Sequence, residues 1–427
     1  MKNKSVLDGY LFPRGYTNYI FMLLFLLYMF DYIDRMVVTS MFTSIEKDWG
    51  MTDTQGGMLV SAVYWSIVIL TFPISILVDR WSRRKTIAIM ATIWSFATAL
   101  CALTGNFTQL LFARILIGAG EAGYAPGGTA MISALYPQQK RAQMIGVWNA
   151  SIPLGTAIGV ALGGFIAAHW GWKHAFGLVA IPGLIISILF FFVKDYKTIP
   201  LNLSDNVGSA AKPRTSQIVK EFAGKPSFIF TCFGIAAVIF VTTALITWLP
   251  RYLEASQGLE EETAGLRASL VFLLAIVGAP LGGYLSDRWR KYRINARLLF
   301  PAITTAVSAV ILFVALNFVR GLGQYFMLLT FGLTVTAFIS AAAAVTQDVI
   351  HAGLRANAYA IAVVVQNLLG ASTAPVLIGA MIDSEGIDKA LSILPLMLLI
   401  GSILFYLGSR HYEKDFKRVK VVEIESI

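Results

Sequence analysis

The 427-residue sequence contains few charged residues, few cysteines and few histidines. Aspartate, glutamate, lysine and arginine together make up only 14% of the chain, well below the share typical of soluble domains. Two cysteines, Cys101 and Cys232, and four scattered histidines offer neither a disulfide framework nor the spacing of a metal site. A Walker-type phosphate-binding loop is also absent, which argues against an ATP-driven motor within this chain. We therefore expect no metal and no cofactor.

Apolar residues, in contrast, are abundant. They account for 57% of the sequence, and the mean hydropathy is +0.69. A helix needs about 20 apolar residues to cross a bilayer. We count twelve such stretches, at 19–45, 56–78, 86–104, 109–131, 143–167, 174–193, 227–250, 268–285, 298–319, 323–346, 356–382 and 390–409. The first is too long for a cleaved signal peptide and is followed at once by another. The sequence predicts an all-α integral membrane protein with twelve transmembrane helices.

The net charge of +10 is distributed unevenly between the two sides of this predicted membrane protein. Most of the 34 lysines and arginines fall in the two terminal segments and in alternate loops, and only a few fall in the other loops. Such a bias is the positive-inside pattern of membrane proteins. It predicts a multi-pass protein of the plasma (inner) membrane with both termini cytoplasmic. The basic balance then reflects topology, and we expect no nucleic-acid partner.

An internal repeat divides the predicted spans into two halves. A shift of 208 residues aligns Gly50 with Gly258 and the "DRW" beginning at Asp79 with the "DRW" beginning at Asp287, and a later shift of 214 continues the match. The stretch 194–226, rich in Lys, Ser, Pro and Asn, reads as a cytoplasmic linker. We predict two six-helix bundles, 1–193 and 227–409, related by a pseudo-two-fold axis along the membrane normal, and a cytoplasmic tail, 410–427.

With twelve spans, a duplicated half and the basic loop "DRWSRRK" (79–85), the chain resembles the major facilitator superfamily over essentially its whole length. Ser75 and Ser82 stand where that family usually has glycine. "DYIDR" (31–35), "RILIGAGEAGY" (114–124) and "NASIPLGTAIGVALGG" (149–164) resemble the spinster-like branch and the organic anion:cation symporters, and "LRANAYAIAVVVQNLLG" (354–370) is more spinster-like. The resemblance implies a monomeric transporter that works by alternating access. The two branches carry different cargo, so the substrate stays open.

Four charged residues lie within the apolar stretches of the first half: Asp34, Arg35, Arg114 and Glu121. At the corresponding positions the second half has only uncharged residues: Thr242, Thr243, Leu328 and Val335. Duplicated scaffolding would need the charges in both halves. An ionisable residue at membrane depth is costly and by default marks a functional pathway. We therefore interpret these charges as the working site of the protein.

The spacing of the embedded charges suggests how they are paired. Arg114 and Glu121 are two helical turns apart on one face, about 10 Å along the axis, which leaves room for the pair from the first span to interleave. Either Arg114 holds Asp34 while Arg35 approaches Glu121, or a substrate anion lies between the two bases. Burial raises the pKa of a carboxyl group and a nearby guanidinium lowers it. We therefore assign proton coupling to Asp34 and Glu121, and anion binding to Arg35 and Arg114.

Two alternatives stay open at this site. The four charges could form a static buried network that only specifies how the helices pack. Asp31, three residues before Asp34, is either a member of the site or a polar neighbour that lines the cavity. Further cavity residues are suggested by their polar or aromatic character at depth: Tyr64, Asn149, Thr243, Gln366 and Asn367. Gly155, Gly159 and Gly163, spaced by four, indicate close helix packing rather than binding.

The basic loops carry a second group of candidates. In the family that the chain resembles, the acid of this loop contacts a helix end of the opposite half and closes the cytoplasmic side. The resemblance thus implies a gate formed by Asp79, Arg80, Arg84, Asp287 and Arg288. An acid is also favoured near a helix N-terminus.

Three classes of function are compatible with these patterns. The leading one is a proton-coupled carrier of a small organic anion, whose partners are its substrate, protons and the lipid bilayer. The second is a carrier of a lysolipid or another amphiphile on the same scaffold. The third is a membrane receptor or an intramembrane enzyme. We disfavour an enzyme because the sequence shows no nucleophile and base together at membrane depth.

Overall fold

The computed structural model describes residues 10–80, 82–195, 221–351 and 354–419, and within these ranges the chain forms helices and no strands. The first half contains α1 (Arg14–Met36), the 3₁₀ turn η2 (Val37–Ser40), α2 (Phe42–Trp49), α3 (Asp53–Arg80), α4 (Arg83–Cys101), α5 (Phe107–Glu121), α6 (Tyr124–Leu135), α7 (Gln138–Asn149), α8 (Ser151–Trp170) and α9 (Trp172–Phe191). The second half contains α11 (Pro226–Gln257), α12 (Glu261–Leu273), α13 (Ala275–Arg290), α14 (Ala296–Asn317), α15 (Gly321–Val335), α16 (Ile339–Asp348), α17 (Arg355–Gln366), the π turn η4 (Asn367–Ala371), α18 (Ala374–Glu385), α19 (Ile387–Ser392) and α20 (Leu394–Lys417).

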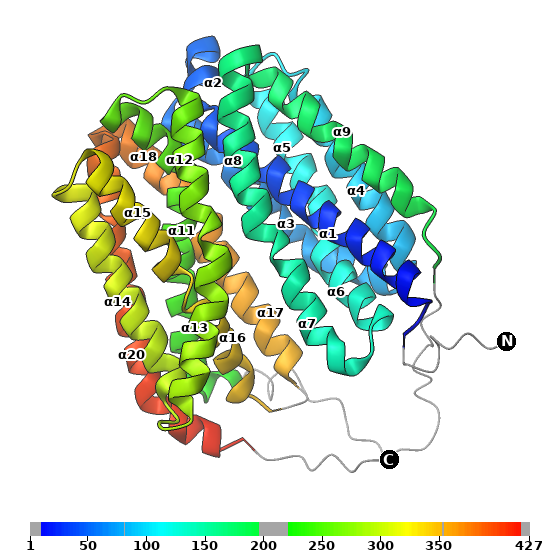
Figure 1. The fold of residues 1–427 in the computed structure, drawn as a ribbon, viewed down its shortest axis with the longest axis vertical. Coiled ribbons are helices and arrows are strands. Elements are labelled where there is room, and N and C mark those ends of the chain that lie inside the picture. Colours follow the sequence, from blue (N-terminus) through cyan, green and yellow to red (C-terminus); the bar gives the residue numbers. More distant parts are fainter. Residues whose placement is uncertain (1–9, 81, 196–220, 352–353, 420–427) are drawn as a thin grey trace.

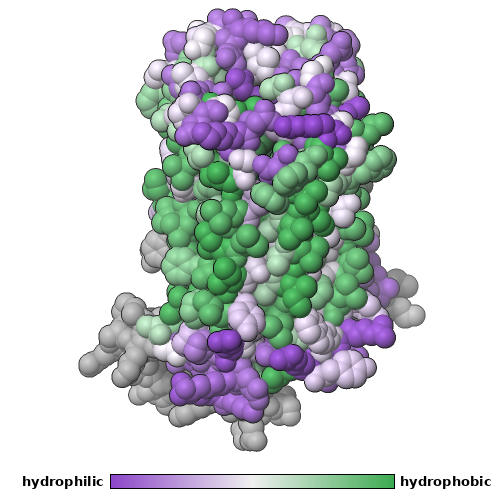
Figure 2. Space-filling model, turned by 90° about the vertical axis from the view of Figure 1, so that its left-hand side faces the viewer, coloured by the Kyte–Doolittle hydropathy of each residue, from purple (hydrophilic) through white to green (hydrophobic). Residues whose placement is uncertain are grey.

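On the face shown in Figure 2, a broad apolar belt lies between two polar caps. Within the described ranges, nine helical segments are long and apolar enough to cross a membrane. The three other predicted spans coincide with α1, with α4, and with α5 followed by α6. α1 carries Asp31, Asp34 and Arg35, and these charges lower its apolar character. The predicted fold class, a twelve-span all-α membrane protein built from two bundles, is confirmed.

The two halves lie side by side, the first drawn in blue to green and the second in green to red (Figure 1). α1 begins and α20 ends in the lower part of this view, and we call that end the terminal end. The opposite end carries α2 and the connections from α11 to α12 and from α18 to α19, and we call it the distal end. The predicted linker lies largely outside the described residues, so the domain boundaries stay predictions.

The repeat seen in the sequence recurs in the backbone. Gly50 ends α2 with φ +64°, and Gly258 ends α11 with φ +64°. Each donates its N–H to the carbonyl of the residue four positions earlier, Glu46 or Glu254. A helix end that enters the left-handed region favours glycine, because glycine has no Cβ. The two glycines, 208 residues apart, therefore terminate equivalent helices in the two halves.

Glycines on α8 allow α1 to pack directly on its backbone. A Cβ added at Gly155, Gly159 or Gly163 would lie 2.4, 2.8 or 2.3 Å from a carbonyl oxygen of α1 or of the turn η2 that follows it. Real Cβ atoms do not approach this closely, so any larger residue would push the two helices apart. The prediction that these glycines serve helix packing is confirmed.

The halves meet along two seams that correspond to each other in the repeat. α3 packs against α18, and α12 packs against α8. A Cβ at Gly57 of α3 would lie 2.2 Å from the carbonyl oxygen of Pro375, and a Cβ at Gly265 of α12 would lie 3.0 Å from that of Val160. Both seams thus depend on a glycine at the same repeat position, and the first is the tighter one.

Candidate transport site

The site begins where α1 stops being an α-helix. After Met36 the chain tightens into the 3₁₀ turn η2, and a guanidinium group from α5 lies beside this transition. Arg114 is fully buried and donates from Nε to the carbonyl of Leu59 at 3.0 Å, from Nη1 to that of Asp34 at 3.0 Å, and from Nη2 to that of Arg35 at 2.8 Å. Buried carbonyl groups need such donors. Arg114 therefore ties the end of α1 to α3 through main-chain contacts.

Arg35 lies at the centre of the embedded charges. Its Nη2 donates to Oε2 of Glu121 at 2.7 Å and to Oδ2 of Asp31 at 3.1 Å. Its guanidinium carbon also lies 4.6 Å from the ring centre of Tyr32 and 5.2 Å from that of Tyr64, within the range of cation–π attraction. The predicted approach of Arg35 to Glu121 is found. Asp31 and Tyr64 both contact Arg35 directly.

Small residues allow Glu121 to reach this position. A Cβ at Gly118 would lie 2.4 Å from the carbonyl oxygen of Val63 in α3, and a Cβ at Gly120 would lie 2.7 Å from the main-chain nitrogen of Trp94 in α4. α5 therefore packs backbone to backbone against both neighbours. It ends at Glu121, which is only 4% exposed. The carboxylate is thus held in a protein interior from which water is largely excluded.

Arg114 contacts Asp34, as one of the two arrangements suggested by the spacing has it, but through the main chain and not through the carboxylate. Arg114 directs its N–H groups at three main-chain carbonyls, one of which belongs to Asp34. Asp34 is fully buried, and neither oxygen of its carboxylate has a hydrogen-bond partner among the described residues. Sequence spacing brought the two residues together correctly, but it could not show that the arginine binds the backbone instead of the side chain.

The other predicted cavity residues lie in several elements. Asn149 ends α7 and is exposed, whereas Thr243 in α11 is buried. Gln366 ends α17, and Asn367 begins the π turn η4; both are half-buried. The π turn packs against α11 and against α3 of the other half. Single π turns within α-helices are frequent at functional sites.

The predicted gate residues lie at the terminal end. The side chains of Asp79 and Arg80 are outside the described part of the structure. Nη1 of Arg84 donates to the carbonyl of Val193 at 2.8 Å, and Asp287 pairs with Arg297 at 3.2 Å, in each case within one half. Arg288 is exposed. These contacts do not bridge the halves in this conformation, so the gate role stays a prediction.

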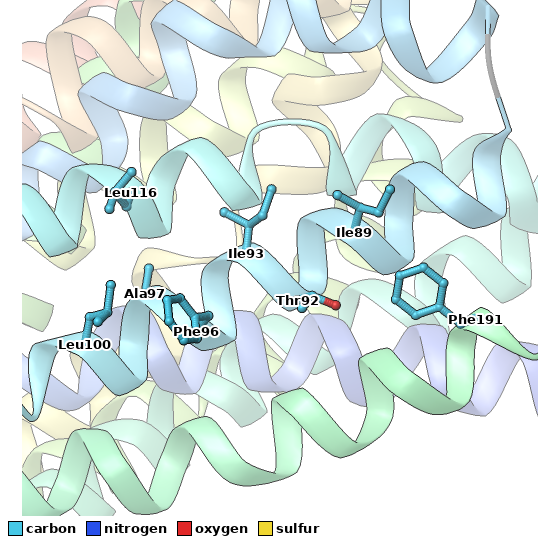
Figure 3. Close-up of a pocket in the computed structure, with 8 residues that line it drawn as sticks. All are labelled: Ile89, Thr92, Ile93, Phe96, Ala97, Leu100, Leu116 and Phe191. Atoms are coloured by element: carbon cyan, nitrogen blue, oxygen red, sulfur yellow. The ribbon is translucent and has the colours of Figure 1, made fainter.

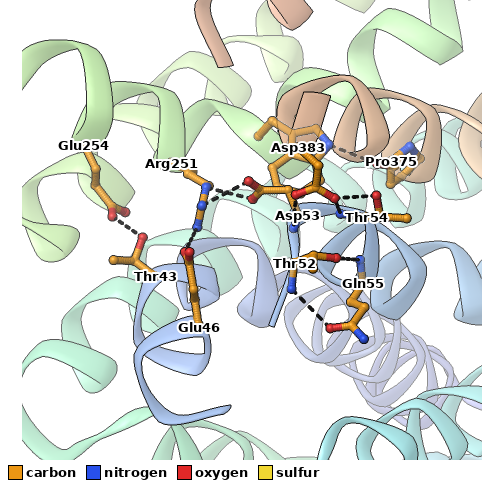
Figure 4. Close-up of polar contacts among 11 residues, drawn as sticks. Thr43, Glu46, Thr52, Asp53, Thr54, Gln55, Arg251, Glu254, Pro375 and Asp383 are labelled. Carbon is orange, nitrogen blue, oxygen red and sulfur yellow. Dashed lines mark hydrogen bonds and ion pairs between the residues drawn. The ribbon is translucent and has the colours of Figure 1, made fainter. Parts of the chain in front are cut away.

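Sequence reasoning missed a set of polar contacts that joins the halves at the distal end (Figure 4). Arg251 binds Glu46 at 2.6 Å and Asp53 at 2.8 Å. Thr43 donates to Glu254 at 2.6 Å. The Ser44 hydroxyl donates to Glu261 at 2.6 Å. We call these contacts of Arg251, Thr43 and Ser44 with the four acids the distal latch. The repeat shift of 208 pairs Glu46 with Glu254 and Asp53 with Glu261, and it could have drawn attention to these acids.

A further acid strengthens the distal contact. Asp383, near the end of α18, accepts hydrogen bonds at 2.8 Å from the main-chain N–H groups of Asp53 and Thr54 at the start of α3. A carboxylate at a helix N-terminus is favoured by the helix dipole and satisfies N–H groups that have no partner within the helix. The structure therefore represents a state in which the halves are joined at the distal end.

The sequence model of the family described as the Major Facilitator Superfamily matches residues 24–375 of this chain. The chain belongs to this superfamily. Its members are membrane transporters, so the chain is a transporter and not an enzyme.

The named relatives include a hexuronate transporter and several spinster proteins. The chain is 28% identical to a hexuronate transporter of Bacillus subtilis over 68% of this chain and 69% of the relative. It is 27% identical to protein spinster homolog 1 of Xenopus tropicalis over 98% of this chain and 85% of the relative. It is 26% identical to the sphingosine-1-phosphate transporter of Danio rerio over 88% of this chain and 80% of the relative.

A solved structure shares the fold. The crystal structure of a bacterial homolog of the human lysosomal transporter spinster, inward-facing and unoccupied, superposes with a TM-score of 0.82. The identity is 22%, and the match covers 95% of this chain and 99% of the other. The chain is therefore spinster-like in sequence and in fold.

Proposed function

We propose that the protein is a proton-coupled secondary transporter of a small organic anion and that Arg35 is the anion-binding cation. One observation carries this proposal: Arg35 is held by the carboxylates of Glu121 and Asp31, deep inside the first half. The second half provides uncharged polar residues, among them Thr243, Gln366 and Asn367, which would orient the substrate. Asn149 would do the same from the first half.

The balance of buried charge supports proton coupling. Three carboxylates, of Asp31, Asp34 and Glu121, share the interior with two guanidinium groups, of Arg35 and Arg114. If all five are ionised, one negative charge has no partner. An uncompensated buried charge is costly. One bound proton removes this cost, and Glu121 and Asp34 are the groups that we propose to carry it.

The same contacts suggest how proton and anion are coupled. A proton on Glu121 weakens its hold on Arg35, because a charge-assisted hydrogen bond becomes a weaker one. The guanidinium is then available for a carboxylate or phosphate of the substrate. The aromatic rings of Tyr32 and Tyr64 keep Arg35 in place during the exchange. Loss of the proton lets Glu121 compete with the substrate again. Arg114 acts as a positioning residue, since its donors are used by the main chain of α1 and α3.

Alternating access places these events in the membrane. We propose that the terminal end faces the cytoplasm, that the protein lies in the plasma (inner) membrane, and that it works as a monomer. The distal latch then closes the outer side while the central site communicates with the cytoplasm. Rocking of the two halves about this site would break the latch and close the terminal end, where Asp79, Arg80, Arg84, Asp287 and Arg288 would take part.

A second candidate substrate is an amphiphile with an anionic head group, such as a lysolipid. It is supported by the spinster relatives, which match almost the whole chain, and by the sphingosine-1-phosphate transporter among them. The head group would use Arg35 in the same way as a small anion. The two candidates therefore differ in the size of the apolar part and not in the charge that is recognised.

Transport by the purified protein in proteoliposomes tests both candidates. Radiolabelled glucuronate and sphingosine-1-phosphate would be offered with and without an inward proton gradient. We expect one of them to accumulate only with the gradient. Glu121→Gln keeps the shape of the side chain but fixes it as neutral, so accumulation should fall at least tenfold while exchange without a gradient continues. Asp388→Asn is the matched control, because Asp388 is an exposed acid of the distal end.

Two results would contradict the proposal. Full pH-driven accumulation by Glu121→Gln would show that Glu121 is not the coupling site. A lower melting temperature with unchanged coupling would show that the charges form a static network.

A further inference from the structure

A groove on the outer surface of the first half lies apart from the transport site. It has a volume of about 340 Å³ and runs along α4, with Leu116 of α5 at one end and Phe191 of α9 at the other (Figure 3). The residues that α4 contributes are Ile89, Thr92, Ile93, Phe96, Ala97 and Leu100. They recur every three or four positions and so form one helical face.

The lining of this groove is apolar except for one threonine. Its polar member, Thr92, donates its hydroxyl to the carbonyl of Ala88 at 2.8 Å and lies 3.2 Å from the hydroxyl of Ser187, so its polar atom is already satisfied. Ile93 and Phe96 are 44% and 58% exposed. In a membrane protein this face meets hydrocarbon chains and not water. The groove therefore suits an acyl chain.

The length of the groove matches one leaflet of a bilayer. From Ile89 to Leu100 the axis of α4 rises about 16 Å at 1.5 Å per residue. The hydrocarbon core of a bilayer is about 30 Å thick. An acyl chain whose head group lies at the terminal end of α4 would thus follow the groove to about the middle of the membrane.

Positive charge surrounds the terminal end of the groove. Lys85 is exposed and precedes Ile89 by four residues, so it lies on the same face of α4. Arg84 is a second basic residue here, and its contact with the carbonyl of Val193 joins the start of α4 to the end of α9. Asp195, which accepts a hydrogen bond from Ser82, is the acid of this cluster. The balance of these charges favours an anion.

We propose that this groove binds an anionic phospholipid of the surrounding bilayer, with one acyl chain along α4 and the phosphate beside Lys85. Charge complementarity and the length of the groove both lead to this occupant. The groove shares no residue with the embedded charges, so it does not depend on the proposed proton and anion chemistry. Arg84, near its terminal end, is also one of the proposed gate residues. The site would hold α4, α5 and α9 together from the outside of the first half.

Native mass spectrometry of the full-length, delipidated protein tests the site. Dioleoylphosphatidylglycerol and dioleoylphosphatidylcholine would be titrated separately, and we expect the anionic lipid to bind more tightly. A basic residue near a membrane surface contributes roughly a fivefold gain in affinity for anionic lipid. Lys85→Glu should therefore lower the affinity for phosphatidylglycerol by about tenfold or more. Lys291→Glu is the control, because Lys291 is an exposed lysine just after α13 in the second half.

A second variant tests the acyl-chain part. Ile93→Trp places a bulky ring in the groove and should weaken both lipids to a similar extent. Val310→Trp serves as its control, because Val310 lies on α14 and is 59% exposed. Equal affinity of the wild-type protein for the two lipids would overturn the proposal. So would equal effects of Lys85→Glu and Lys291→Glu, or of Ile93→Trp and Val310→Trp.

Discussion

The two halves of this transporter agree at the distal end and differ at membrane depth. At the distal end each half provides a repeat-related pair of acids to the other: Glu46 and Asp53 in the first half, Glu254 and Glu261 in the second. The second half also provides Asp383. At depth only the first half carries charge. Interface residues that both halves keep serve the packing of one bundle on the other. We propose that the charged residues found in one half alone serve transport, which a symmetrical scaffold cannot provide by itself.

The hydrogen-bond donors of the distal latch also differ between the two halves, although the acids correspond. Arg251 and Thr43 are repeat counterparts, 208 residues apart, and each binds an acid of the other half. One arm is thus an ion pair and the other is a hydroxyl–carboxylate hydrogen bond. Charge-assisted hydrogen bonds between ionised partners are stronger than those of a neutral donor. The latch is therefore symmetrical in its acids and asymmetrical in strength.

The largest expected effect on stability comes from removing one of the buried charges that only the first half has at membrane depth. Arg114→Leu gives the first half the residue that the second half has at Leu328. Three buried carbonyls then lose their donor, and the buried carboxylates lose a neighbouring cation. Removing one partner of a buried charge network costs about 3–5 kcal/mol. Thermal unfolding of the purified protein should show a marked loss of stability.

The control for this prediction keeps the positive charge at position 114 but removes the planar guanidinium group. Arg114→Lys has all its donors on one nitrogen and lacks the planar guanidinium whose three nitrogens reach the three carbonyls. It should therefore unfold at a temperature between those of the wild type and Arg114→Leu. Wild-type stability of Arg114→Leu, combined with lost substrate binding, would contradict the positioning role and restore Arg114 as an anion-binding residue.

How much of the fold and of the candidate site could be predicted from the sequence depended on the type of contact. The spans were predictable because lipid demands long apolar helices. The pairing of Arg35 with Glu121 was one of two arrangements that the two-turn spacing of Arg114 and Glu121 suggested. The partners of Arg114 were not predictable, since main-chain carbonyls are available at every residue. The 3₁₀ turn after Met36, which places those carbonyls, left no pattern either. The distal acids were overlooked because charges at span ends usually face water.

A smaller effect is expected from the glycines of the two seams. Gly57→Ala puts a Cβ 2.2 Å from the Pro375 carbonyl, whereas Gly265→Ala puts one 3.0 Å from the Val160 carbonyl. Overpacking of this kind costs about 1–3 kcal/mol. Gly57→Ala should therefore shift the protein further from the distally closed state than Gly265→Ala does.

Spin labels at Thr108 and Leu322, repeat counterparts at the distal starts of α5 and α15, would report the separation of the halves. Double electron–electron resonance should show a longer distance for Gly57→Ala than for Gly265→Ala. The reverse order would mean that the two seams do not open as the static distances suggest.

The smallest effect is expected from the two arms of the latch. Arg251→Thr removes the ion pairs with Glu46 and Asp53, and we expect a loss of about 1–2 kcal/mol, because Glu46 is half-exposed. Thr43→Val removes one hydrogen bond of a neutral donor, worth about 1 kcal/mol. The same spin labels should therefore show more of the open distal state in Arg251→Thr than in Thr43→Val.

Exchanging the donors sharpens this last test. The double variant Arg251→Thr with Thr43→Arg moves the guanidinium to the repeat counterpart, where Glu254 and Glu261 take the places of Glu46 and Asp53. If the charge of the donor sets the strength of the latch, the double variant should close the distal end more fully than Arg251→Thr alone. A double variant as open as Arg251→Thr would show that the surroundings of Arg251, and not its charge, hold the halves together.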